Sequence, residues 1–320
     1  MHIKTIAIVG PRGNVGTALI TELLANPAEF TITALTRSNS PYTPQSAAIE
    51  VIEVDFTSLD SLTTALKGQD AIAICIPGGA VRLDSQKLLL DAAIAAGVKL
   101  FFADEYVSNI RNPAYVAMPA QFVGDKIAVR AMLEERSAKG EICWTALNGG
   151  PFFDMWLTKG PAGFDIPNRL ARVYGTGDNQ ACWTPLPVMG RAAANMLRNP
   201  GPFLNRALFI SGVKGLSQNA LLVALEEQVG KFEVTHVDVK KIKREAEEAG
   251  KKGEVGKWMK GMTVNSNFNE EESHSDFWHL VENDLVGVEA VSVGEAVRET
   301  LERCGRNVKV VEALFRVGEE

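Results

Sequence analysis

The chain has 320 residues, of which 46% are hydrophobic and 22% charged, and its formal net charge is −6. This apolar fraction is typical of a packed globular protein and excludes a largely disordered chain. The negative charge argues against a general nucleic-acid-binding surface, which is usually basic, and no apolar run is long enough to span a membrane. The 4 cysteines lack CxxC spacing, and the first residues lead directly into a predicted strand, so we expect a reduced, cytoplasmic protein.

Short β-branched runs alternate with longer segments of helical periodicity through the first half of the chain. Such alternation, with nearly continuous apolar strands, is typical of a parallel sheet covered by helices on both faces. We therefore predict a doubly wound α/β fold of the Rossmann type, which binds ligands at the carboxyl ends of its strands. The predicted strands are 6–9, 31–35, 51–54, 71–76, 98–102 and 142–147, and the predicted helices lie within 17–26, 58–68, 84–97 and 126–140.

The second half is less regular, with proline and glycine concentrated in 149–167 and again in 199–202. We expect an NADP-binding domain and a smaller, irregular part that binds the substrate. The segment 238–260 carries many charges of both signs, which indicates a solvated helical face followed by a loop; a partner-docking helix is the other interpretation. The expected division assigns residues 1–150 and 176–199 to the NADP-binding domain, and residues 151–175 and 200–320 to the smaller part.

Three glycines follow the first predicted strand and enter a helix that should begin near Val15. Without a Cβ, such a turn can bring backbone N–H groups close to a pyrophosphate, and the helix N-terminus favours the negative charge. The third glycine would let helix and strand pack closely. The GxxGxxG spacing alone is a weak signal, but between a strand and a helix it predicts dinucleotide binding. The predicted contacts here are Gly10, Arg12, Gly13, Asn14, Val15 and Gly16.

The second predicted strand is followed by Arg37, where NAD-selective sites usually place an acidic residue for the ribose 2′-hydroxyl. Arg12 lies in the glycine turn and would project toward the same region. Two arginines suit the 2′-phosphate of NADP, because guanidinium groups form paired, charge-assisted hydrogen bonds to phosphate. We therefore predict NADP(H) as the cofactor, with Ser38 beside Arg37; two ordinary surface arginines are the alternative.

Residues after the third and fourth predicted strands would complete the cofactor site. Asp55 and Phe56 follow the third strand. Asp55 would meet the adenine edge or, equally well, cap the helix that begins near Ser58. The loop after the fourth strand would lie near the nicotinamide half. Its predicted contacts are Pro77, Gly78 and Gly79.

Further motifs carry a resemblance to a known family. DSQKLLLDAAIAAGVKLFFADEY is similar to Q…AAxxAGVKRFxPSEF, and KIAVRAMLEE to KxxVRRxIE. With the GxxGxxG turn, the motifs in this order resemble the NmrA-like, isoflavone-reductase-like branch of the atypical short-chain dehydrogenases/reductases, over nearly the whole chain. The resemblance places Lys126 on the family's catalytic lysine. It also implies cofactor contacts from Glu105, Lys126 and Asn148, the last within TALNGGPFFDMWL.

The chain also departs from the family pattern. Ala103-Asp104 replaces the usual Pro-Ser, and Phe122 stands four residues before Lys126, so the Tyr-x-x-x-Lys pair of ordinary short-chain dehydrogenases is absent. The isoflavone-reductase branch lacks this tyrosine too. We expect Lys126 to bind the ribose and to protonate or polarise the substrate oxygen, with Tyr106 as a candidate replacement for the missing tyrosine. A lysine on the exposed face of a helix is the alternative.

Aromatic residues after the sixth predicted strand would wall an apolar substrate pocket, with ordinary packing as the alternative for each. The histidines form no HExxH motif and have no cysteine at ligand spacing, so we expect no metal site. The predicted substrate contacts are Phe152, Phe153, Trp156 and Trp183.

These patterns together predict an NADPH-dependent reductase of a small, apolar, aromatic or oxygenated metabolite of secondary metabolism, as a monomer or homodimer. Two other functions stay open. A regulator of the NmrA type would bind NADP without turning over a substrate, and an isomerase would retain NADP(H) with no net redox change.

Overall fold

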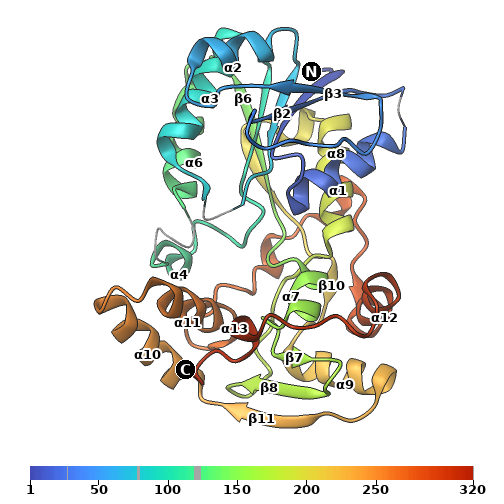
Figure 1. The fold of residues 1–320 in the computed structure, drawn as a ribbon, viewed down its shortest axis with the longest axis vertical. Helices are drawn as coiled ribbons and strands as arrows, with labels where there is room; N and C mark the ends of the chain where they lie inside the picture. The colour runs from blue at the N-terminus through green and yellow to red at the C-terminus, as the bar shows by residue number, and fades with distance from the viewer. Residues whose placement is uncertain (27, 78–79, 119–123, 320) are drawn as a thin grey trace.

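The computed structural model describes residues 1–26, 28–77, 80–118 and 124–319. Its central feature is a seven-stranded sheet with the order β3-β2-β1-β4-β5-β6-β9, in which every pair of neighbours is parallel (Figure 1). This arrangement confirms the predicted doubly wound α/β fold. The strands are β1 (Thr5–Val9), β2 (Thr31–Thr36), β3 (Ile49–Glu53), β4 (Ala71–Ile74), β5 (Leu100–Ala103), β6 (Cys143–Asn148) and β9 (Arg206–Phe209).

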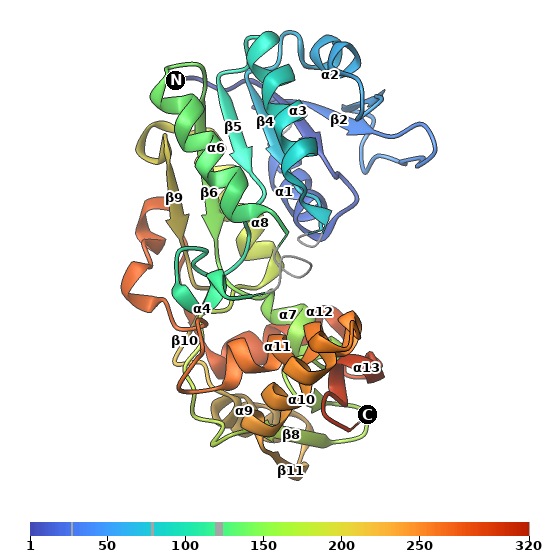
Figure 2. The same ribbon diagram turned by 90° about the vertical axis from the view of Figure 1, so that its left-hand side faces the viewer.

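Helices cover both faces of this sheet, as Figure 2 shows. Side chains alternate along a strand, so Ile6 and Ile8 of β1 join one apolar cluster while Ala7 and Val9 join the other. The first cluster contains residues of α1 (Asn14–Leu24) and α8 (Leu186–Arg198). The second contains residues of α2 (Leu59–Leu66), α3 (Leu83–Ala95) and α6 (Lys126–Ala138).

A smaller part lies beyond the carboxyl ends of the strands and has its own apolar cluster (Figure 1). It contains a three-stranded sheet of order β11-β8-β7 and a short β10-β12 pair. Its elements are α7 (Phe153–Lys159), β7 (Phe164–Asp165), β8 (Leu170–Tyr174), β10 (Val213–Lys214), α9 (Gln218–Val229), β11 (Glu233–Val237), α10 (Val239–Lys251), α11 (Val255–Phe268), β12 (Val291–Ser292), α12 (Val293–Cys304) and α13 (Glu312–Phe315). Shorter helices are α4 (Pro113–Val116), η2 (Gly201–Phe203), η3 (Trp278–Leu280) and η4 (Asn283–Val286).

The expected division of the chain does not account for β9. This strand pairs with β6 in the main sheet, with Thr145 opposite Arg206, although residues from 200 onward were assigned to the smaller part. The chain thus returns to the main sheet after α8 has crossed its face. β9 is as long as β4 and β5, but it follows the proline- and glycine-rich stretch 199–202, after which the alternation of strands and helices is no longer regular.

The charged segment 238–260 differs in part from its prediction. Its first half is the solvated helix α10, which buries Val239, Ile242, Ala246 and Ala249. The loop predicted to follow is wrong, because a second helix, α11, begins directly after a turn. Gly261 of α11 fits closely on α10, since a Cβ there would lie 2.5 Å from the Ala246 Cβ. In the described part of the chain, no helix is both long and apolar enough to cross a membrane.

Candidate active site

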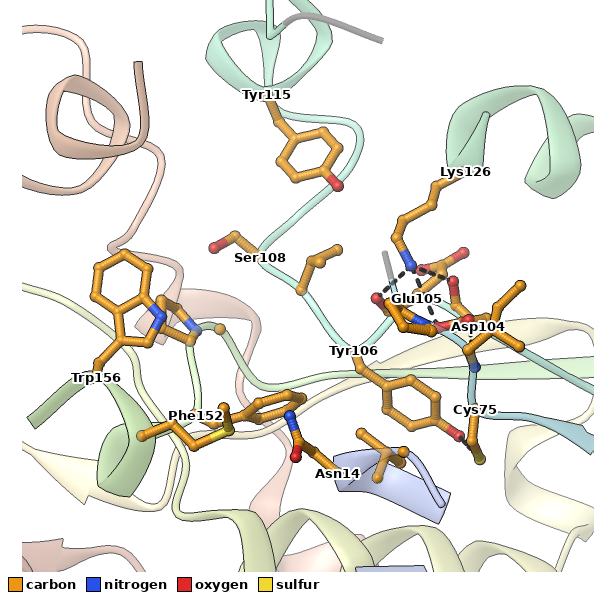
Figure 3. Close-up of a pocket in the computed structure, with 18 of the residues that line it drawn as sticks. Asn14, Cys75, Asp104, Glu105, Tyr106, Ser108, Tyr115, Lys126, Phe152 and Trp156 are labelled. Carbon is orange, nitrogen blue, oxygen red and sulfur yellow. Dashed lines mark hydrogen bonds and ion pairs between the residues drawn. The ribbon is translucent and has the colours of Figure 1, made fainter. Parts of the chain in front are cut away.

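A cavity of about 610 Å³ lies between the carboxyl edge of the main sheet and the smaller part (Figure 3). Two sets of residues line it, which we name by their origin. The sheet wall consists of Arg12, Gly13, Asn14, Val15, Cys75, Ile76, Pro77, Asp104, Glu105, Tyr106 and Lys126. The outer wall consists of Val107, Ser108, Tyr115, Gly150, Pro151, Phe152, Met155, Trp156, Ser266, Asn267 and His274.

The glycine turn of the sheet wall packs tightly against its neighbours. Gly10 has φ +80°, and a Cβ there would lie 2.5 Å from the Cys75 carbonyl oxygen. A Cβ on Gly13 would lie 2.7 Å from the same oxygen, and one on Gly16 would lie 2.3 Å from the Gly10 oxygen. The predicted close approach of helix and strand at Gly16 is therefore confirmed, and the turn also needs glycine to approach β4.

The N-terminus of α1 faces the cavity without a cap. Gly13 is the N-cap residue, and no side chain among the described residues accepts a hydrogen bond there. Asn14 and Val15, the first two residues of the helix, line the cavity. Unsatisfied N–H groups at a helix start favour an anion, so this corner suits a phosphate group.

Arg12 reaches the loop that follows β2. Its Nη1 donates a hydrogen bond to the Pro41 carbonyl oxygen at 2.9 Å, and its Nη2 contacts the Ser40 hydroxyl. Ser40 N–H in turn donates to the Arg37 carbonyl at 2.9 Å. Arg37 and Ser38 are exposed directly after the end of β2. The structure thus brings Arg12 to the turn that carries Arg37, as the predicted site requires.

Asp55 does not cap α2, so that alternative is wrong. The cap is Ser58, whose hydroxyl accepts a hydrogen bond from Ser61 N–H. Asp55 Oδ1 instead accepts from the hydroxyl and the N–H of Thr57, at 2.6 and 2.8 Å, and these bonds hold its pKa below the ordinary value. The contact with adenine stays a prediction. Phe56 is half-buried against the core, on the α2 side of the sheet.

The segments that follow β4 and β5 line the cavity. Pro77 lines it, whereas Gly78 and Gly79 lie outside the described residues. Tyr106 has φ 44° and is buried, with its hydroxyl 3.8 Å from Cys75 Sγ (Figure 3). Burial raises the pKa of Tyr106 well above its ordinary value. Tyr106 therefore keeps its proton, and either the hydroxyl or the thiol is the donor in this contact.

Lys126 is buried at the start of α6, with 1% of its side chain exposed, so the alternative of an exposed lysine is wrong. Its Nζ donates to the carbonyl oxygens of Asp104 and Glu105, at 2.5 and 3.0 Å, and to Asp104 Oδ1 at 3.3 Å. Asp104 Oδ2 accepts from Ile76 N–H at 2.9 Å. Burial raises the pKa of Asp104 to about 6, although the nearby ammonium of Lys126 lowers it.

Glu105, a residue of the sheet wall, holds the chain after β5 in place. Its carboxylate accepts from Arg130 Nε and Nη2, at 2.6 and 2.5 Å, and from Asn148 Nδ2 at 2.8 Å. The Arg130 guanidinium lies over the Trp144 ring, 4.7 Å from its centroid. Asn148, predicted to contact the cofactor, is fully buried behind Glu105 and is absent from the cavity lining.

Two of the four predicted substrate contacts line the outer wall. Phe152 and Trp156 face the cavity, together with Met155, which the sequence analysis missed. Phe153 and Trp183 are instead 0% and 1% exposed in the core of the smaller part, so ordinary packing is correct for these two. A helical turn at the start of α7 sends adjacent residues to different sides, which composition alone does not reveal.

The sequence analysis also missed the polar residues of the outer wall. Tyr115 comes from α4, and its ring centroid lies 5.2 Å from that of His274. His274 Nδ1 lies 3.2 Å from the Ser266 carbonyl oxygen, and burial lowers the pKa of His274 to about 4. Isolated polar residues in short helices and loops carry no spacing signal, so no motif identifies them. Among the described residues, no group of His, Cys, Asp and Glu could hold a metal ion.

Comparison with known proteins identifies the family. Residues 2–150 match the NmrA-like family. The oxidoreductase aprR from Aspergillus flavus is 32% identical over 257 residues, covering 80% of this chain and 84% of the relative. The isoflavone reductase homolog from Zea mays is 26% identical over 242 residues, 71% of this chain and 74% of the relative.

The fold also matches solved structures. The NADPH complex of the quinone oxidoreductase QOR2 from Escherichia coli superposes with a TM-score of 0.67 at 22% identity, covering 92% of this chain and 99% of that one. Its match spans both the main sheet and the smaller part of the present structure. The chain thus belongs to the NmrA-like family, in its isoflavone-reductase-like branch, and is an oxidoreductase.

Proposed function

We propose that this oxidoreductase is an NADPH-dependent reductase of a small, aromatic, oxygen-bearing metabolite. The observation that carries the proposal is the cavity itself. It joins a glycine turn and a buried lysine on the sheet wall to Phe152 and Trp156 on the outer wall. A reductase needs such a space to hold a substrate next to its cofactor.

The residues of the sheet wall fit a phosphorylated dinucleotide. The turn at Gly10 and Gly13 leaves no room for a Cβ, and the uncapped start of α1 offers N–H groups to a pyrophosphate. Arg12 and Arg37 would hold the 2′-phosphate. When bound, NADPH supplies the hydride. The structural relative QOR2 was solved with NADPH, which agrees with this choice of cofactor.

Lys126 would supply positive charge beside the reacting oxygen of the substrate. A buried ammonium acts in a medium of low dielectric constant, where it stabilises negative charge more than it would in water. Its three bonds to the Asp104 and Glu105 segment hold it in one position. Phe152 and Trp156 would orient an aromatic substrate and exclude water from the reacting atoms.

The open cavity favours a reductase over the two other functions considered. A regulator that senses NADP alone needs the sheet wall for the dinucleotide, but it has no need of an outer wall lined by Phe152, Met155 and Trp156. An isomerase would use the same cavity, and it differs only in showing no net consumption of NADPH. Measuring NADPH oxidation against the product formed from an aromatic ketone or quinone separates these functions, because a reductase oxidises one NADPH for each product molecule it forms.

Cofactor choice is tested by titrating NADPH and NADH into the protein and into Arg12→Ala and Arg37→Ala. Each charge-assisted hydrogen bond contributes about 1.5–3 kcal/mol, so each variant should bind NADPH about 10- to 150-fold more weakly. Binding of NADH should barely change. Arg298→Ala, which removes an exposed arginine of α12, is the matched control. Equal affinity of the parent protein for both dinucleotides would contradict the proposal.

A further inference from the structure

The hydroxyl of Tyr115 is a buried polar group without a partner. Tyr115 is 2% exposed, and its hydroxyl has no hydrogen-bond partner among the described residues. Figure 3 shows the ring entering from α4 with its hydroxyl directed into the space between Ser108 and Lys126. Buried polar groups are almost always paired, so one that points into a cavity indicates a group supplied by a ligand.

The two catalytic candidates from the sequence are already engaged. A lysine ammonium has three protons, and Lys126 Nζ has three acceptors, two carbonyl oxygens and one carboxylate oxygen. The hydroxyl of Tyr106 lies against the Cys75 thiol. In this arrangement Lys126 has no proton left for a substrate, and the Tyr106 hydroxyl is occupied by its contact with the thiol. The Tyr115 hydroxyl has no such contact among the described residues.

We propose that the Tyr115 hydroxyl donates a hydrogen bond to an oxygen of the substrate and so orients it in the cavity, an inference that rests on the proposed reductase function. The substrate group is a hydrogen-bond acceptor such as a ketone, quinone or ether oxygen. Its flat apolar body lies on Phe152 and Trp156 of the outer wall.

Tyr115 is suited to donating a hydrogen bond rather than to losing its proton. Burial, followed by the nearby carboxylates of Glu105 and Asp104, raises the pKa of Tyr115. The hydroxyl therefore stays protonated at any working pH, and a substrate oxygen that gains negative charge strengthens the bond. Contact with His274 fixes the ring from its far side, at a centroid distance of 5.2 Å.

Calorimetric titration with two matched probes tests the inference without turnover. The probes are 2-acetylnaphthalene, which carries a ketone, and 2-ethylnaphthalene, which has nearly the same shape without the oxygen. They are added to the NADP⁺-saturated parent protein and to Tyr115→Phe. The substitution should weaken binding of the ketone about three- to tenfold and leave the hydrocarbon unchanged.

Tyr174→Phe is the matched control. Tyr174 is also a buried tyrosine, but it lies in the core of the smaller part and outside the cavity lining. Its substitution should change the affinity for neither probe. Because the Tyr115 hydroxyl has no partner among the described residues, Tyr115→Phe should not lower the melting temperature of the free protein.

Three results with the variant would overturn the inference. Tyr115→Phe leaves ketone affinity unchanged, or it weakens both probes equally, or it lowers the melting temperature clearly, which would reveal a partner within the chain. A parent protein that does not distinguish the two probes overturns it as well. Failure of the proposed function is a separate result, since it appears as absent NADPH oxidation while the ketone still depends on Tyr115 for binding.

Discussion

The two walls of the cavity are built by different means. The sheet wall comes from strand ends and the starts of α1 and α6, and its geometry depends on backbone contacts such as those of Gly10 and Lys126. The outer wall comes from α4, α7 and the residues around His274, and it presents side chains on short helices and loops. In such folds, a rigid sheet edge holds the cofactor while side chains on loops and short helices contact the substrate. The same cofactor site can therefore occur in proteins with different substrates.

The largest effect is expected at the sheet wall, from Lys126→Met. Loss of a charged group that acts at the reacting atoms typically reduces turnover about 100- to 10,000-fold. The affinity for NADPH should change little, because the phosphate contacts lie at α1 and β2. Steady-state kinetics and NADPH titration measure the two quantities separately.

Lys139→Met is the control for this change. Lys139 follows the same helix and pairs with Glu135 on the surface, so its loss should leave turnover unaffected. A fully active Lys126→Met protein would remove the lysine from the mechanism. A large loss of NADPH affinity would show instead that the lysine acts chiefly by holding the cofactor site together.

The contrast between the walls also explains what the sequence could predict. Period-2 and period-3.6 patterns located the main sheet, and the glycine spacing located the turn because backbone geometry there admits no other residue. Lys126 was found through the family motif. Tyr115 and His274 could not be found, because each comes from a segment without periodicity and they meet only when the smaller part packs against the sheet. Trp183 shows the opposite error, in which an aromatic residue expected at the site lies in the core.

Gly10→Ala should damage the sheet wall through the backbone. A left-handed φ costs a non-glycine residue about 1–2 kcal/mol, and overpacking against the Cys75 carbonyl adds roughly 1–3 kcal/mol. Gly68→Ala has nearly the same φ, +79°, with nothing within 4 Å of the added Cβ, so it should show the first cost alone. Denaturant unfolding of the two variants measures their losses of stability. Equal losses of stability would mean that close approach to β4 does not require the glycine.

Opposite effects of pH are expected from the two walls. Asp104 has a pKa of about 6 in the folded protein against 3.8 in a free side chain, so the folded state binds the extra proton and stability falls as pH rises from 4 to 6. His274 has a pKa of about 4 against 6.5, so the unfolded state binds the extra proton and stability rises over the same range. In the parent protein the two effects offset one another.

Removing either group should expose the other. The free energy of unfolding of Asp104→Asn should rise as the pH increases from 4 to 6, and that of His274→Gln should fall over the same range. Each slope should be at most about 1.4 kcal/mol per pH unit. Denaturant unfolding at several pH values gives the slopes, and the remaining titrating groups are common to all three proteins. If the free energy of unfolding depended on pH in the same way in both variants, the burial of these two groups would be contradicted.

The smallest effect separates Phe152 of the outer wall from its chain neighbour Phe153. Phe152 lines the cavity, whereas Phe153 is 0% exposed in the core of the smaller part. Phe152→Leu should lower the affinity for 2-acetylnaphthalene about threefold, since an aromatic pair contributes about 0.5–1.5 kcal/mol beyond burial, with little change in stability. Phe153→Leu should lower the free energy of unfolding by about 1 kcal/mol and leave the affinity unchanged. If both variants changed the same quantity, the boundary between the cavity and the core would not run between these two residues, and the assignment of Phe152 to the substrate would fail.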